Sequence, residues 1–189
     1  MASAPLPAPQ ASAYWPPLQI GGVAIDLTHL NPFQLGFASE RLKRDLRIDV
    51  TFTNHCFTDH FLDGVHDPAW KIMDHKRERV FCFTRHTMSR LLPEMVRQLP
   101  GAKVTQARQD RNHVYVAHLG DEAGHHYPMF FRLEKVKARG RDLTLTVESA
   151  YTCTAFEMRR KLEGGRAIAF AVLAAKVFEE RPTLARGRR

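Results

Sequence analysis

The sequence has few cysteines. Only three stand among its 189 residues, and no two of them have a CxxC spacing. An odd number without such a spacing gives no disulfide framework. The first residues also lack a positively charged segment followed by an apolar run of about 7–15 residues, so we expect no secretory signal. These absences predict a cytoplasmic protein in which Cys56, Cys82 and Cys153 stay reduced.

Long apolar runs and common nucleotide motifs are missing as well. The most apolar stretch, residues 167–178, is interrupted by Lys176 and is shorter than the roughly 20 residues that a membrane span needs. We therefore expect a buried helix at about residues 165–180, and no membrane association. The sequence has no GxSxG, P-loop or dinucleotide-binding glycine pattern. Kinase, NTPase and Rossmann oxidoreductase functions are disfavoured.

The composition is that of a globular protein, with 44% hydrophobic and 25% charged residues. Residues 1–17 are rich in alanine and proline and carry no charged side chain, which predicts a flexible leader. We expect residues 18–180 to form a single α+β domain. Residues 181–189 form a basic tail without an acidic residue.

The net charge of +8 is unevenly distributed. Four of the positive charges belong to the tail, as Arg181, Arg186, Arg188 and Arg189, which leaves +4 for the rest of the chain. Such a tail can bind phosphates non-specifically through counterion release. It can equally be a disordered, solvating end. Both interpretations stay open.

Periodicity and turn signals predict β-structure before the first helix. Two short β-prone runs, residues 18–20 and 23–27, flank Gly21-Gly22 and predict a hairpin. Residues 46–52 then alternate between apolar and polar side chains, which predicts a half-buried strand. Residues 59–76 show no period and predict a loop. A short strand is expected at residues 80–83.

The helical pattern of residues 86–99 contains Pro93, so we expect a kink or two short helices. Four β-prone runs follow, at residues 103–108, 112–119, 127–136 and 142–151, joined by short polar links. Such links imply antiparallel neighbours. The prediction is an antiparallel four-stranded meander packed by helices, with an N-terminal β-rich extension.

Strand alternation assigns side chains of the meander to two faces. Leu143, Leu145, Val147 and Tyr151 are assigned to the core face, with Met129, Phe131 and Leu133 on the neighbouring strand. In the second strand Val114 and Val116 are assigned to the core. The open face would then carry four polar side chains: His113, Tyr115, Arg132 and Glu148.

These four side chains suit cleavage of RNA without a metal. A carboxylate can accept the proton of a ribose 2′-hydroxyl, and an imidazole can protonate the leaving oxygen. An arginine can bind the phosphate through two hydrogen bonds and stabilise the developing charge. The competing interpretation is a solvated sheet face on which Arg132 and its carboxylate neighbours simply pair.

A helix followed by a four-stranded antiparallel sheet, with Glu, Arg and His on the face away from the helix, resembles the barnase/RelE-like ribonuclease and toxin superfamily. The resemblance covers about residues 84–151 and implies catalytic roles for Glu148, Arg132 and His113. The segments Asn54-His55-Cys56-Phe57-Thr58 and Val147-Glu148-Ser149-Ala150-Tyr151 are also similar to segments of bacterial proteins labelled stationary-phase growth adaptation proteins. That second resemblance covers most of the chain after the leader and implies little about mechanism.

Histidines and cysteines are concentrated in residues 54–86. Four of them, His55, Cys56, His60 and Cys82, would be the ligands of a zinc site, although their spacing matches no common zinc motif. Alternatively, the cysteines pack as small hydrophobic residues and the histidines lie at the surface. No other cofactor is expected.

Arg85 and Arg90 lie near the start of the predicted helix, where phosphate binding is one interpretation and a solvated face the other. Three functions remain open at this point, the last of them a purely structural adaptor without a nucleic-acid role. The first is an RNA-directed protein, in its sharpest form a metal-independent endoribonuclease of toxin type using His113, Tyr115, Arg132 and Glu148. The alternative is a non-catalytic accessory or interaction protein, zinc-stabilised or not, that binds nucleic acid or a protein partner or inhibitor. Under either of the first two, Arg85, Arg90, Arg186, Arg188 and Arg189 are the expected nucleic-acid contacts.

Overall fold

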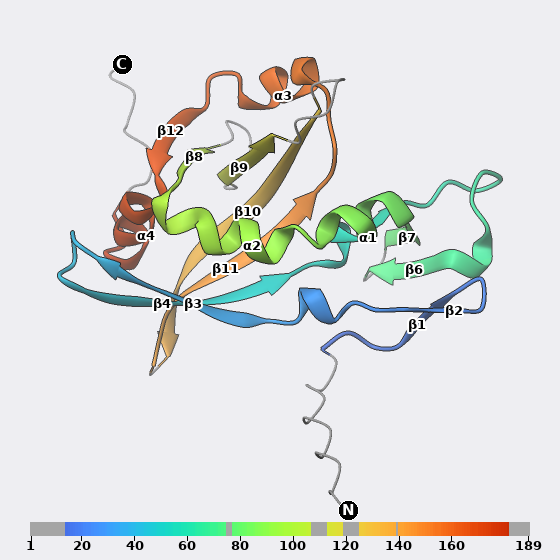
Figure 1. The fold of residues 1–189 in the computed structure, drawn as a ribbon, viewed down its shortest axis with the longest axis horizontal. Helices are drawn as coiled ribbons and strands as arrows, with labels where there is room; N and C mark the ends of the chain where they lie inside the picture. The colour runs from blue at the N-terminus through green and yellow to red at the C-terminus, as the bar shows by residue number, and fades with distance from the viewer. Residues whose placement is uncertain (1–13, 75–76, 107–112, 119–124, 139, 182–189) are drawn as a thin grey trace, which may run out of the picture.

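The structure, a computed structural model, describes residues 14–74, 77–106, 113–118, 125–138 and 140–181. Within this part of the chain the largest sheet has seven strands, in the order β12-β8-β9-β10-β11-β4-β3 (Figure 1). Their bounds are β3 (Phe33–Ser39), β4 (Arg44–Phe52), β8 (Lys103–Gln106), β9 (His113–His118), β10 (His126–Ala138), β11 (Arg141–Ala150) and β12 (Arg166–Ala169).

The α+β class is confirmed, but the prediction of a four-stranded antiparallel sheet is wrong. Strands β8 to β11 are consecutive antiparallel neighbours, yet β4 pairs with β11 in parallel and places Val50 beside Leu145. Strands β3 and β12 extend the sheet at its two edges. Short links identify antiparallel partners alone, so a parallel pair whose strands lie far apart in the chain could not be predicted from them. Strands β3 and β4 therefore belong to the main sheet and are not an extension of it.

Two smaller sheets come from the N-terminal half of the chain. Strands β1 (Leu18–Ile20) and β2 (Val23–Ile25) form the predicted hairpin. Gly21 and Gly22 both have positive φ, at 57° and 80°, which the turn between such closely spaced strands requires. Strands β5 (Thr58–His60), β7 (Arg77–Phe81) and β6 (Lys71–Asp74) form the other sheet in that order. The expectation of a loop at residues 59–76 was wrong for residues 59–60 and 71–74, which lie in strands too short to show a clear alternation. It is confirmed for residues 61–67.

Helices α1 (Phe83–Ser89) and α2 (Leu92–Gln98) confirm two short helices in place of one. Pro93 stands in the first turn of α2, where its missing N–H costs no helical hydrogen bond. Helix α3 (Ala155–Leu162) was not predicted. The expected final helix begins later than predicted, as α4 (Phe170–Phe178), because Arg166–Ala169 pairs with β8. Single 3₁₀ turns occur at Thr28–Leu30, Asn54–Cys56, Pro68–Trp70 and Leu99–Gly101.

The main core lies between one face of the large sheet and helices α2 and α4. Leu143, Leu145 and Val147 from β11 are fully buried there, as are Leu92 from α2 and Leu173 from α4. Each such side chain contributes about 1.5–3 kcal/mol relative to exposure. A smaller cluster on the other side of the sheet consists of Val114, Cys153 and Met158 under α3. No helix in the described ranges is long and apolar enough to cross a membrane.

Candidate functional site

Arg132 and Glu148 lie on the same face of the sheet, as predicted. The Arg132 Nη2 atom is 3.1 Å from Glu148 Oε1, and its Nε atom is 3.3 Å from Glu134 Oε2. Glu148 is the extra residue of a β-bulge, because Phe130 pairs with Ser149 whereas Phe131 pairs with Val147. The guanidinium is therefore neutralised by two carboxylates, as the solvated-face interpretation expects.

His113 and Tyr115 lie on the opposite face, so their predicted placement was wrong. The register of β9 against β10 puts His113 beside Phe131 and Tyr115 beside Met129, on the core side. The His113 ring is 4% exposed and stacks on Phe131 at 5.8 Å, and burial lowers its pKa to about 4. The Tyr115 hydroxyl contacts Gln98 of α2 at 3.4 Å. His113 therefore cannot protonate a leaving group held by Arg132 and Glu148.

Tyr151 also lies on a different face from the one predicted. The bulge at Glu148 adds one residue to β11, so Ala150 points into the core in its place. The Tyr151 ring stacks on Phe130 at 5.5 Å, on the outer side of the sheet. Two cations approach this ring, Arg85 at 5.2 Å and Lys161 at 5.1 Å from its centroid. Tyr151 thus links helix α1 to helix α3.

The proposed zinc ligands are not brought together. His55 Nε2 is 2.9 Å from the carboxylate of Asp74, whereas Cys56 is fully buried and burial raises the pKa of its thiol to about 12. His60 is exposed on β5, and Cys82 lines a pocket next to α1. Among the described residues, no group of three or more His, Cys, Asp and Glu side chains is placed to hold a metal ion.

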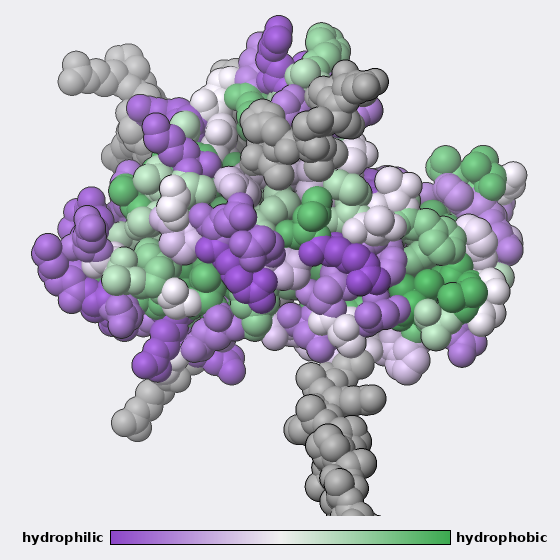
Figure 2. Space-filling view, in the orientation of Figure 1, coloured by the Kyte–Doolittle hydropathy of each residue, from purple (hydrophilic) through white to green (hydrophobic). Residues whose placement is uncertain are grey.

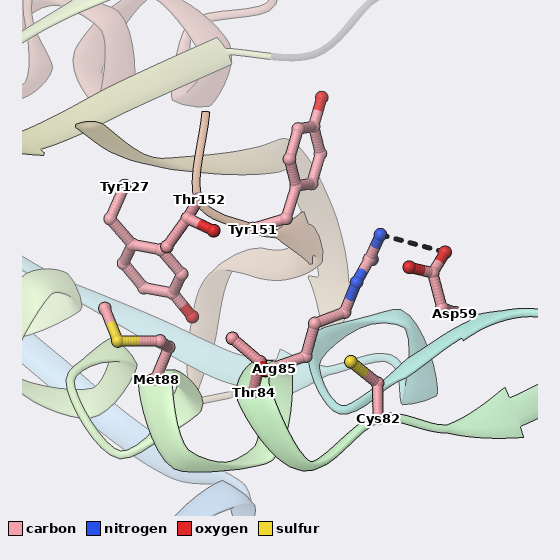
Figure 3. Close-up of a pocket in the computed structure, with 8 residues that line it drawn as sticks. All are labelled: Asp59, Cys82, Thr84, Arg85, Met88, Tyr127, Tyr151 and Thr152. Atoms are coloured by element: carbon pink, nitrogen blue, oxygen red, sulfur yellow. Dashed lines mark hydrogen bonds and ion pairs between the residues drawn. The ribbon is translucent and has the colours of Figure 1, made fainter. Parts of the chain in front are cut away.

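Of the predicted nucleic-acid contacts, Arg85 and Arg90 fall within the described ranges. Arg85 donates to the carbonyl of His55 at 3.2 Å and to Asp59 Oδ1 at 3.1 Å. Arg90 is exposed just after α1. Arg186, Arg188 and Arg189 lie outside the described residues. Arg85 also lines a pocket of about 250 Å³ between α1 and the ends of β10 and β11 (Figure 3).

Helix α3 presents a cationic and aromatic face. It begins with a capping box, in which Thr154 Oγ1 accepts the N–H of Glu157 and the Glu157 carboxylate accepts the N–H of Thr154. Phe156 is 67% exposed. Arg159 and Arg160 are exposed three and four residues further on, and no described carboxylate lies within 4 Å of either. Figure 2 shows strongly hydrophilic residues beside apolar ones over this helix, at the top of the view.

The model of the YjaZ family matches residues 17–178 of this chain. The chain belongs to that family. No curated protein and no solved structure matches it. The family match brings no reaction or ligand with it, so the function of this YjaZ-family protein has to be argued from its own geometry.

Sequence reasoning missed the α3 face of this YjaZ-family protein, although a signal was present. Thr154 followed by Glu157 is the S/T-x-x-E pattern of a helix N-terminus. Taken together with Arg159, Arg160 and Phe156, that pattern would have indicated a helix with a basic surface. Tyr127, which lines the pocket next to α1, was missed for a different reason. Its environment depends on how α1 packs against the end of β10, which no local pattern encodes.

Proposed function

We propose that this YjaZ-family protein binds single-stranded RNA, without cleaving it, through the exposed face of α3. One observation supports this: the exposed ring of Phe156 has Arg159 and Arg160 beside it on the helix, and these arginines lack a carboxylate partner within the described ranges. Side chains three and four residues apart are neighbours on a helix surface. The ring and both guanidinium groups can therefore contact one strand together.

The chemistry of the three side chains fits unpaired nucleotides. A base stacked on an exposed aromatic ring contributes about 1–3 kcal/mol. Arginines next to that ring can bind the flanking phosphates and release condensed counterions. A duplex keeps its bases stacked within the helix, so Phe156 would find no base to stack on. Single-stranded RNA is the partner that uses every feature of this face.

Cleavage is not proposed, because the geometry does not support the predicted catalytic set. His113 lies on the core side of β9, and both of its ring nitrogens are buried without a hydrogen-bond partner in the described structure. Arg132 already pairs with Glu134 and Glu148. A general acid, a general base and a phosphate ligand therefore do not meet on one face of this sheet.

Fluorescence anisotropy with a labelled single-stranded RNA of mixed sequence, measured at several salt concentrations, tests the proposal. Replacing both Arg159 and Arg160 by alanine removes two phosphate contacts. We expect weaker binding and a slope of log K against log salt that is smaller by about 1.4. Phe156→Ala should weaken binding with little change in slope, because stacking releases few ions.

The matched control is the double variant Arg41→Ala, Arg44→Ala, which removes the same charge from residues that pair with Glu179 and Asp142. It should leave the slope unchanged. A second set of titrations uses a chain ending at residue 181, to separate the contribution of Arg186, Arg188 and Arg189. An equal loss of affinity in the α3 variant and the control would contradict the assignment, as would tighter binding of duplex than of single strands.

A further inference from the structure

The pocket next to α1 contains a buried hydroxyl group that has no partner. Tyr127 is 0% exposed, and its Oη atom has no hydrogen-bond partner among the described residues. Its ring packs in the main core from β10, and its hydroxyl group points toward Met88 and Thr84 of α1 (Figure 3). Because an unsatisfied buried polar group is destabilising, such groups in native structures call for an explanation.

Further hydrogen-bond donors surround the same space. Thr84 and Thr152 are exposed residues that line the pocket, and neither hydroxyl group has a hydrogen-bond partner within the described ranges. Arg85 brings a positive charge and has N–H groups beyond those bonded to His55 and Asp59. Burial raises the pKa of Tyr127, so its hydroxyl group stays protonated and can donate. The pocket thus offers several hydrogen-bond donors next to the Arg85–Asp59 ion pair.

The pocket also limits the size and type of its occupant. A volume of about 250 Å³ is at the small end for ligand sites. Asp59 is the carboxylate in its lining, and Asp59 Oδ1 already accepts from Arg85 and from the backbone N–H of His60. The side chain of Met88 and the ring of Tyr151 provide apolar contact area.

We propose that this pocket binds a small molecule through one oxyanionic group, a carboxylate or a phosphate. Tyr127, Thr84 and Thr152 donate hydrogen bonds to the oxyanion. Arg85 keeps its ion pair with Asp59 at 3.1 Å and donates one of its remaining N–H groups. A short hydrocarbon part of the ligand lies against Met88 and Tyr151. The site is separate from the RNA-binding face of α3, because none of Phe156, Arg159 and Arg160 lines it.

The experiment uses the full chain and four probes: inorganic phosphate, acetate, benzoate and benzamide. Isothermal titration calorimetry gives each affinity. We expect benzoate to bind, and benzamide, which has the same shape without the charge, to bind at least tenfold more weakly. Comparison of phosphate with acetate and benzoate decides which oxyanion the pocket takes.

Tyr127→Phe removes the one hydroxyl group and keeps the ring. We expect affinity for the preferred probe to fall about tenfold or more, as for a hydrogen bond to a charged group. The unliganded variant should be at least as stable as the parent in thermal unfolding, because the group that it loses has no partner. Thr152→Val, at an exposed position, should also weaken binding. Tyr115→Phe is the matched control: its hydroxyl group contacts Gln98 outside the pocket, so affinity should not change.

Three results would overturn the inference. They are the absence of binding by all three anions, equal affinity in Tyr127→Phe and the parent chain, or a Tyr127→Phe variant that is clearly less stable without ligand. The last would mean that the hydroxyl group serves the fold. The RNA affinity of Tyr127→Phe, measured in parallel, should equal that of the parent chain. The anion titrations can therefore be interpreted even if the chain does not bind RNA through α3.

Discussion

His113 is buried and His29 is half-buried, and both imidazoles stay neutral in the folded protein. The ring nitrogens of His113 have no hydrogen-bond partner in the described structure. His29 Nε2 is 2.7 Å from Ser89 Oγ, and its Nδ1 atom is buried without a partner in the same ranges. Burial lowers the pKa of each to about 4, and for His29 the nearby Arg90 and His86 add to the effect. Both rings resist protonation because the charged form would lose its hydration.

Stability should therefore fall in acid. In the unfolded chain a histidine takes up its proton near pH 6.5, whereas in the folded protein these two do so near pH 4. The two neutral histidines make their full contribution to the free energy of unfolding above about pH 6.5. This contribution declines as the pH falls toward 4. For each group the free energy of unfolding changes with pH by at most about 1.4 kcal/mol per pH unit.

Urea unfolding at pH 7.5, 6.0 and 5.0 measures this pH dependence. His113→Leu should flatten the pH dependence by the share of one group, whereas His60→Gln, an exposed control, should run parallel to the parent. Parallel curves for His113→Leu would contradict the assignment.

At the residue scale, alternation predicted the faces of β10, and those of β11 as far as the bulge at Glu148, because one face alone is apolar there. On β10 and β11 it separated Phe131 and Leu145 from Arg132 and Glu148. On β9 it failed because Val114 is buried under α3 on the outer face while His113 is buried on the inner one. A strand covered on both sides has no polar face from which its orientation can be deduced. The alternation pattern therefore could not predict to which face of the sheet the His113 side chain points.

At the scale of elements, α3 depends on its first turn. Thr154→Ala removes the acceptor for the N–H of Glu157 and should cost about 1 kcal/mol in unfolding experiments. Fraying of the first turn also disturbs the spacing of Phe156 and the arginines, so RNA affinity should fall with it. The matched control is Thr87→Ala, an exposed threonine within α1 whose loss removes no cap. Equal effects of both variants on anisotropy would show that the cap does not support the RNA-binding face.

The β-bulge at Glu148 is a feature that predicting the strands from the sequence did not reveal. One inserted residue moves Tyr151 from the core to the outer face, where Phe130, Arg85 and Lys161 surround it. The pocket next to α1 depends on that shift, since Tyr151 lines it. A bulge is set by the pairing of two strands, so it cannot be read from either strand alone.

At the scale of the whole molecule, the parallel pairing of β4 with β11 makes β4 and its neighbour β3 part of the main sheet. The stretch that the sequence analysis compared with small ribonucleases, about residues 84–151, contains β8 to β11 but lacks β4. Ile48, Val50 and Phe52 of β4 lie beside Leu143, Leu145 and Val147, and all six side chains are buried. That stretch also lacks α4, whose Phe170 and Leu173 fill the same core.

An isolated fragment of residues 84–151 should therefore fail to fold. Without β4 and α4 it loses at least five buried side chains, namely Ile48, Val50, Phe52, Phe170 and Leu173, each contributing about 1.5–3 kcal/mol. That loss is as large as the whole stability of a typical domain. It would also expose β11 as an unpaired edge, which favours aggregation. A fragment of residues 14–181 keeps the complete sheet and should fold. Amide proton dispersion in two-dimensional NMR spectra separates the two cases. A well-dispersed spectrum from residues 84–151 would show that the meander folds independently, and that β4 and α4 add to a core already complete without them.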